Sequence, residues 1–173
     1  MDLKNLSEEE IVELVKEKKV TGADLTDNGI CPTCFNTKHN GVLFGDDSPR
    51  MIYEDEDFRC FLVGNPRCIG HTVIITKNHY KDMMEIEDEI CSRIYVLAKK
   101  VMNVLKDTYN AESVYLCTMC DGPMNHFHVQ LIPRYDYEKR GSKNFVKERS
   151  DYVEDKEKLE ELREKLNNLY IKK

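Results

Sequence analysis

The stretch that most constrains the fold is residues 125–134, NHFHVQLIPR, in which polar and apolar side chains alternate. Successive side chains of a β-strand point to opposite faces, so His126, His128 and Gln130 are expected on one face and the apolar residues between them on the other. Two histidines on one strand face lie about 7 Å apart, too far to bind one ion from a regular strand. We therefore expect them to have different roles within one site. Pro133 lacks a backbone donor and predicts that the strand ends there or lies at a sheet edge.

The simplest alternative to a functional site in residues 125–134 is an exposed amphipathic edge strand that carries histidines by chance.

The length and charge of the chain limit the classes of protein to which it could belong. The chain has 173 residues, which suits one domain with terminal extensions. Its formal net charge of −6 argues against nonspecific binding to nucleic acid, so no nucleic-acid partner is expected.

Three features of the sequence predict the cellular compartment: its first residues, the length of its apolar runs and its number of cysteines. Residues 1–5 lead into an acidic helix and not into the apolar core of a signal peptide. No apolar run approaches the roughly 18 residues that a membrane span needs. Seven cysteines cannot all pair within one chain. Together these features predict a cytoplasmic protein that does not enter a membrane.

Hydrophobic periodicity predicts an antiparallel α+β domain. Residues 7–10 read as a capping box, followed by a short helix that should stop near residues 21–22, and residues 23–41 are expected to be irregular. Apolar residues three and four apart predict a long helix over 86–109, closed by Asn110 in the left-handed conformation. Strands are expected at 51–53, 58–63, 72–76, 114–119 and 126–132. This order of elements is typical of an α+β fold.

The chain divides into three expected parts: an N-terminal helical extension (1–30), a central domain (31–135), and a basic loop with a C-terminal helix (136–173). The last helix carries an apolar stripe formed by Leu159, Leu162, Leu166 and Leu169. Such a stripe usually packs on its own domain, and a dimer contact is the sharper alternative.

Cys31 and Cys34 form a C-x-x-C pair, which lets two thiolates reach one tetrahedral zinc ion from a tight turn. Cys-Pro-x-Cys also looks like a glutaredoxin redox pair, which should follow an apolar strand and open a helix. Residues 24–30, which precede this pair, do not read as such a strand. Two plain thiols are a third reading. The second pair, Cys117 and Cys120, lies beside apolar residues and is expected to behave as small core hydrophobes.

Residues 126–134 resemble the signature of the histidine triad (HIT) superfamily, in which three histidines alternate with apolar residues and Pro-Arg often follows. Gln130 stands at the third histidine, as in the galactose-1-phosphate uridylyltransferase and diadenosine polyphosphate phosphorylase branches. Upstream, residues 53–55 (YED) and 70–79 (GHTVIITKNH) resemble two further elements of the family. With the Cys31 to Cys34 pair ahead of them, the resemblance runs from about residue 31 to 134.

The resemblance implies a HIT-like antiparallel sheet with one long helix, to which this chain adds N-terminal and C-terminal helical extensions. It implies a homodimer formed through the long helix and adjoining strands. It also implies one structural zinc ion whose ligands are Cys31, Cys34, His79 and His126. His39 is an alternative to His79, and His71, at the entry of a strand, is read as structural.

His128 matches the middle histidine of the family, which attacks phosphorus and forms a covalent nucleotidyl-histidine. For this attack one ring nitrogen must be free, and the other must donate a hydrogen bond that fixes the tautomer. Gln130 can donate a hydrogen bond to a phosphoryl oxygen but cannot titrate. The glutamine therefore favours transfer to phosphate or a sugar phosphate over hydrolysis.

Other positions fit the family less closely. Members commonly carry an acidic residue for the ribose hydroxyls where this chain has Val63, and Asn65 is the nearest polar substitute. Gly122 and Pro123 stand where members carry Gln and Ser or Thr, so Asn125 or backbone amides near Gly122 would have to compensate. A basic tract follows, which either closes over a polyphosphate or stays solvated. Its members are Arg134, Lys139, Arg140, Lys143, Lys147 and Arg149.

The sequence thus predicts a zinc-binding HIT-like nucleotidyl transferase or hydrolase that acts on nucleoside phosphate esters, anhydrides or dinucleoside polyphosphates. His128 and Gln130 are the expected catalytic residues, and Asn65, Gly122, Asn125 and Arg134 the expected nucleotide-binding residues. One alternative is a nucleotide-binding or regulatory module without turnover, favoured by the departures at Val63, Gly122 and Pro123. The other is a thiol redox protein that uses Cys31 and Cys34.

Overall fold

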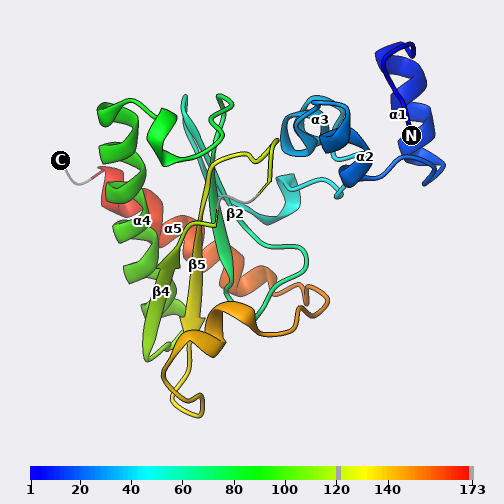
Figure 1. Cartoon of the computed structure of the whole chain (residues 1–173). Coiled ribbons are helices and arrows are strands. Elements are labelled where there is room, and N and C mark those ends of the chain that lie inside the picture. The colour runs from blue at the N-terminus through cyan, green and yellow to red at the C-terminus, as the bar shows by residue number, and fades with distance from the viewer. Residues whose placement is uncertain (120–121, 172–173) are drawn as a thin grey trace.

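A five-stranded antiparallel sheet forms the centre of the computed structural model, which describes residues 1–119 and 122–171 (Figure 1). The strand order is β1-β2-β3-β5-β4. The strands are β1 (Met51–Glu54), β2 (Phe58–Leu62), β3 (Thr72–Thr76), β4 (Ser113–Cys117) and β5 (His128–Arg134). Short 3₁₀ helices occur at Ser48–Arg50, Met83–Glu85 and Ser142–Val146. This arrangement confirms the predicted antiparallel α+β fold.

The long helix α4 (Asp88–Tyr109) lies against one face of the sheet, and α5 (Lys156–Ile171) packs beside it (Figure 1). Asn110 ends α4 in the left-handed conformation, with φ +50°, and its amide donates to the Lys106 carbonyl. Asparagine tolerates this conformation better than most residues, so the long helix ends where its sequence predicts.

The main core lies between the sheet and these two helices. Phe127, Val129 and Leu131, the apolar half of the alternating stretch, are fully buried there. Leu159, Leu162 and Leu166 are buried in the same cluster, whereas Leu169 is 44% exposed. The apolar stripe of the C-terminal helix therefore packs mainly on its own domain.

The N-terminal segment is more helical than predicted. Helix α1 (Glu8–Lys16) begins with the expected capping box but ends five residues before Thr21. Residues 23–41, expected to be irregular, contain most of α2 (Gly22–Asp27) and all of α3 (Pro32–Lys38), so that prediction was wrong. Thr21 and Asp24 form a second capping box, a signal that the turn-rich composition masked.

These three helices have a small core of their own, formed by Leu3, Ile11, Val15, Val20, Leu25 and Phe35. Phe35 lies beyond residue 30, so this cluster includes the start of the predicted central domain. The division of the chain at residues 30 and 135 stays a prediction. No helix among the described residues is long and apolar enough to cross a bilayer.

The expectation for Pro133 was wrong, because β5 lies inside the sheet and continues through Pro133 to Arg134. The amide of Glu112 donates to the Arg134 carbonyl, so the backbone groups of Arg134 point toward β4. In an antiparallel strand those of Pro133 then point the other way, toward β3. The β3–β5 register ends at the pair Thr72 and Leu131, so a missing donor at Pro133 leaves no ladder bond unmade.

The strand also begins at His128 and not at His126. In the second C-x-x-C pair, Cys117 is half-buried at the end of β4, and Cys120 and Asp121 lie outside the described residues.

The buried stripe of α5 yields a stability prediction. Leu162→Ala should lower the free energy of unfolding by about 2–5 kcal/mol, because it leaves a cavity between α5 and the core. Leu169→Ala, on the same stripe but exposed, should change it by less than about 1 kcal/mol. Urea unfolding of both variants measures the difference. Equal effects at the two positions would contradict the packing described for α5.

Candidate active site and metal centre

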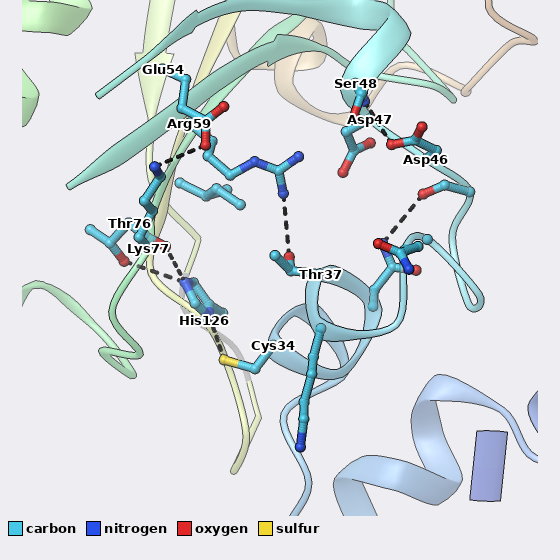
Figure 2. A pocket seen from close by; sticks show the side chains of 16 residues that line it. Cys34, Thr37, Asp46, Asp47, Ser48, Glu54, Arg59, Thr76, Lys77 and His126 are labelled. Carbon is cyan, nitrogen blue, oxygen red and sulfur yellow. Dashed lines mark hydrogen bonds and ion pairs between the residues drawn. The ribbon is translucent and has the colours of Figure 1, made fainter. Parts of the chain in front are cut away.

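Four side chains from distant parts of the chain meet at one point, and they are the predicted ligands Cys31, Cys34, His79 and His126. Their ligand atoms all lie within 4.8 Å of one another. Cys31 is the N-cap of α3 and Cys34 lies in its first turn, whereas His79 follows β3 and His126 precedes β5. The Cys34 sulfur is 3.6 Å from Nδ1 of His79 and 3.3 Å from Nδ1 of His126. Figure 2 shows Cys34 and His126 facing each other.

His126 is oriented to present a lone pair to the two sulfurs. Its Nε2 lies 2.8 Å from the carbonyl oxygen of Thr76 (Figure 2). A carbonyl only accepts, so this nitrogen carries the proton and Nδ1 is left free. Metal-binding histidines are commonly held by such a second hydrogen bond. Two sulfurs and two ring nitrogens at these separations fit a tetrahedral ion, whose ligand atoms lie roughly 3.3–3.8 Å apart.

The electrostatics of the two thiols also suit a cation. The hydrogen bond from Cys34, helped by His126, lowers the pKa of Cys31 to about 3 against the opposing effect of burial. The same hydrogen bond and burial raise the pKa of Cys34, because a second negative charge beside the Cys31 thiolate is unfavourable. A divalent cation between the sulfurs would remove that penalty and allow both thiols to ionise.

One feature of the redox alternative is present, since Cys31 caps α3 and the pair opens a helix. The preceding element is helix α2 and not a strand, which departs from the redox pattern. A redox pair also has no need of two histidines at the sulfurs. The four-residue cluster therefore favours metal binding.

A cleft of about 680 Å³ lies beside this cluster, on the sheet face opposite α4. Its floor is apolar, because Phe61, Val73 and Ile75 form a small cluster on that face. The polar side chains that line it include His71, His126, His128, Gln130, Asp47, Asn65 and Arg149. A floor of this kind with few polar groups is typical of a site for a small organic ligand.

His128 lies in this cleft with a defined tautomer. Its Nδ1 is 2.9 Å from the carbonyl oxygen of His126, so Nδ1 carries the proton and donates. Its Nε2 is 3.1 Å from Nε2 of Gln130, whose amide donates to the ring lone pair. Burial lowers the pKa of His128, which keeps the imidazole neutral at physiological pH. The ring therefore presents an unprotonated Nε2 to the cleft.

His71 sets the orientation of Gln130, a role that its reading as a purely structural residue missed. The backbone amide of Arg67 donates to Nδ1 of His71 at 3.1 Å, which leaves the proton on Nε2. That nitrogen lies 3.1 Å from Oε1 of Gln130, so it donates to the side-chain carbonyl and turns the amide group toward His128. The hydrogen bonds thus form a continuous series in which each donor faces an acceptor. The series runs from the Arg67 amide through His71, Gln130 and His128 to the His126 carbonyl.

The predicted nucleotide-binding residues are spread over several places. Asn65 lines the cleft. Asn125 donates to the Lys81 carbonyl, and Gly122 lies in the turn before β5 with φ +89°. Arg134 is buried, with its guanidinium donating to the hydroxyl of Ser113 and to the carbonyls of Tyr135 and Glu138. The last three do not line the cleft, and their assignment to the nucleotide stays a prediction.

The structure adds groups that the sequence pattern did not single out. Asp47 lines the cleft and also a neighbouring polar cavity of about 530 Å³, shown in Figure 2. It pairs with Arg50 at 2.6 Å, and burial raises the pKa of its carboxyl. Arg50 in turn donates to the Leu62 carbonyl beside Val63. Asp47 lies in a turn-rich segment with no strand or helix period, so only the fold reveals its position.

The burial of His71 generates a prediction about pH. Burial lowers its pKa from 6.5 to about 4, so the unfolded chain takes up this proton at a higher pH than the folded chain. The stability that depends on neutral His71 is complete above pH 6.5 and is lost as pH falls toward about 4, by about 3 kcal/mol at most. Denaturant unfolding of wild type and His71→Gln between pH 4 and 7.5 measures this. Stability curves of the two proteins that run parallel with pH would contradict this prediction. Loss of metal in acid cannot produce a difference between them, because it affects both proteins alike.

Comparison with known proteins gives the family. The family model described as HIT domain matches residues 46–137, slightly more than half of the chain. An uncharacterized HIT-like protein of Methanocaldococcus jannaschii is 36% identical over 100 residues, which cover 55% of this chain and 76% of the relative. The adenylylsulfatase HINT3 of Arabidopsis thaliana is 26% identical over 98 residues, which cover 54% and 49% of the two chains.

Among solved structures, a zinc-bound histidine triad family protein of Mycobacterium smegmatis has a TM-score of 0.61 at 21% identity. The match covers 83% of this chain and 97% of that one, so the shared fold includes more than the family model spans. The sheet with its long helix, the cleft beside His128 and the match over residues 46–137 lead to one conclusion: this chain belongs to the HIT family.

Proposed function

We propose that this protein is a nucleotidyl transferase or hydrolase that forms a covalent nucleotidyl-histidine on His128. The observation that carries the proposal is the state of the His128 ring, which is neutral, fixed by the His126 carbonyl and directed with its free nitrogen into the cleft. Neutral imidazole in this state is suited to attack phosphorus. Membership of the HIT family, whose relatives include an adenylylsulfatase, supports a nucleoside phosphate as the substrate class.

The cleft has suitable places for the parts of such a substrate. The apolar side chains of Phe61, Val73 and Ile75 offer a surface on which a base can lie. Near Val63, where the expected carboxylate is missing, Asp47 supplies one and Asn65 an amide for the ribose hydroxyls. The α-phosphate would then lie at His128.

In the proposed first step, Nε2 of His128 attacks the α-phosphorus and the bond to the leaving oxygen breaks, with the electron pair going to that oxygen. Gln130, which hydrogen-bonds the free nitrogen in the resting state, would release it and donate to a phosphoryl oxygen instead. In the second step an acceptor oxygen attacks the same phosphorus and His128 leaves as neutral imidazole.

Gln130 bears on the nature of the acceptor. Its amide cannot take a proton from attacking water, and His71 behind it has a pKa lowered by burial, so neither is a good general base at neutral pH. An acceptor that is already an anion needs no base. We therefore place this chain among the transferases and phosphorylases with the His-x-His-x-Gln signature, with hydrolysis as the slower reaction.

A nucleotide-binding or regulatory module without turnover is the second candidate. Gly122 lies in an open position: apart from its chain neighbours, no described residue has an atom within 4 Å of where its Cβ would be. Gly122 and Pro123 themselves supply no polar side chain in place of the family's polar residues. A search for labelled nucleotidyl-histidine separates the two candidates.

We further propose that the Cys31, Cys34, His79 and His126 cluster holds one structural zinc ion. Four protein ligands would complete a tetrahedral site, so the ion would stabilise the fold and would not activate a water nucleophile. The ion would join α3 to the β3–β5 pair and close long loops that are otherwise entropically costly. A homodimer formed through α4 and a cytoplasmic location also stay predictions.

The zinc proposal predicts that metal content and stability fall together. Cys31→Ser should reduce bound zinc from one per chain to well below that and lower the thermal unfolding midpoint, because the ligands lie in three parts of the chain. Cys91→Ser is the control, because Cys91 is a half-buried cysteine of α4 that lies outside the cluster. This variant should keep its zinc. Elemental analysis and thermal unfolding measure both. A Cys31→Ser protein that keeps stoichiometric zinc would show that the site is wrong.

The catalytic proposal predicts the effects of two substitutions. His128→Ala should abolish labelled nucleotidyl-enzyme and lower turnover by about 10⁴-fold or more, with nucleotide binding retained. Gln130→His should place a titratable group beside the phosphate and shift products from transfer toward hydrolysis. Acid-quench labelling with dinucleoside polyphosphates, nucleotide sugars and nucleoside phosphoramidates measures the first effect, and product analysis the second.

Two results would count against these proposals. A wild-type protein that binds nucleotide but never becomes labelled would favour the binding module. An unchanged ratio of transfer to hydrolysis in Gln130→His would remove the argument for a transferase and leave the nucleophile in place.

A further inference from the structure

A short segment after the last 3₁₀ helix is bound to the turn between β2 and β3. The amide of Ser150 donates to the Pro66 carbonyl at 2.8 Å, and the Arg149 guanidinium donates to the Asn65 carbonyl at 2.6 Å. From the other side, the Arg67 guanidinium donates to the carbonyl of Lys147. These contacts hold Arg149 at the rim of the cleft that contains His71, His128 and Gln130.

Arg67 and Arg149 lie at the same junction, where each donates to a backbone carbonyl of the facing segment. Over residues 1–119 and 122–171, neither forms an ion pair with a carboxylate, whereas Arg50, Arg93 and Arg163 each do. The Nε atom of Arg67 is buried, and no hydrogen-bond partner for it occurs in the described part of the chain. Arg149 is exposed at the surface, and the partial burial of its guanidinium, followed by the charge of Arg67, lowers its pKa. Two adjacent cations with an unused buried donor are unfavourable unless an anion joins them.

The positive charge also acts on the catalytic groups. Arg149 lines the same cleft as His71, His128 and Gln130, so its positive charge lies beside the place where the phosphorus would be. Its charge also contributes to the lowered pKa of His71, of which burial is the main cause. His128 and Gln130 are both uncharged, so the charge for a polyanionic ligand has to come from other residues.

We propose that Arg67 and Arg149 form a subsite for a second phosphate group, one that is not transferred to His128. In the first step this is the leaving phosphate of a nucleoside polyphosphate, and in the second it is a phosphate acceptor. The inference rests on the proposed function and narrows its substrate class. Guanidinium groups suit phosphate oxygens because their planar donors bind two oxygens at once.

The chemistry of the cleft gives this subsite a purpose. Gln130 cannot protonate a departing group, so the leaving oxygen must depart as an anion. A nearby cationic pair stabilises that developing charge without a proton transfer. The same pair then suits a phosphate dianion as acceptor. Arg67 lies within the residues that match the family model and Arg149 lies outside them, so the C-terminal part of this chain adds one of the two arginines of the subsite.

Equilibrium binding of pyrophosphate tests the subsite without turnover. We expect calorimetry at low ionic strength to show that zinc-loaded wild-type protein binds pyrophosphate, and that Arg149→Gln binds it about 10-fold more weakly or worse. Arg140→Gln is the matched control, because it removes an equal charge from the same basic tract at an exposed position outside the cleft. It should bind within about twofold of wild type. Arg67→Gln, checked by thermal unfolding, should repeat the loss.

Absence of pyrophosphate binding in wild type, or equal losses in Arg149→Gln and Arg140→Gln, would overturn the inference. Labelling experiments keep it separate from the proposed function. If no nucleotide labels the wild type but pyrophosphate binding depends on Arg149, the subsite stands and the proposed catalysis fails. If Arg149→Gln is labelled by a nucleoside polyphosphate with unchanged KM and rate, the subsite fails and the catalysis stands.

Discussion

The antiparallel pairing of β3 with β5 is the constraint on which the rest of the site depends. Its register sets Ile75 opposite His128 and Val73 opposite Gln130. Residues just outside the pair then meet as well: His71 before β3 reaches Gln130, and the Thr76 carbonyl at the other end of β3 receives the ring proton of His126. A slip of one residue would turn every one of these side chains to the other face and destroy both sites together.

The same pair of strands separates two histidine functions that are adjacent in sequence. His126 points its free nitrogen at two sulfurs, and its carbonyl fixes the ring of His128, which points into the cleft. The metal centre therefore acts on the cleft only through backbone that it holds in place. The two ends of the chain complete the arrangement, since α3 brings the cysteines and the segment after the last 3₁₀ helix brings Arg149.

Local sequence patterns were sufficient to predict the elements that are specified by residues close together in the chain. The three and four residue spacing and Asn110 predicted α4, and the alternation in residues 125–134 predicted a strand with Phe127, Val129 and Leu131 in the core. The order of motifs predicted the family, the four clustered Cys and His side chains, and the place of His128 in the cleft. The helix and the strand follow from backbone periodicity, whereas the ligand set and the place of His128 follow from the resemblance to the HIT family.

Tertiary structure alone decided the features that depend on contacts between distant residues. Pro133 sits inside the sheet because β3 ends before it would need a donor, and the fold determines that α4 is an element against which the stripe of α5 packs. His71 acquires its role from Gln130, 59 residues away, and Arg149 acquires its role from a turn 84 residues upstream. A sequence determines which groups can donate, accept or carry charge, whereas only the folded chain determines which of them meet.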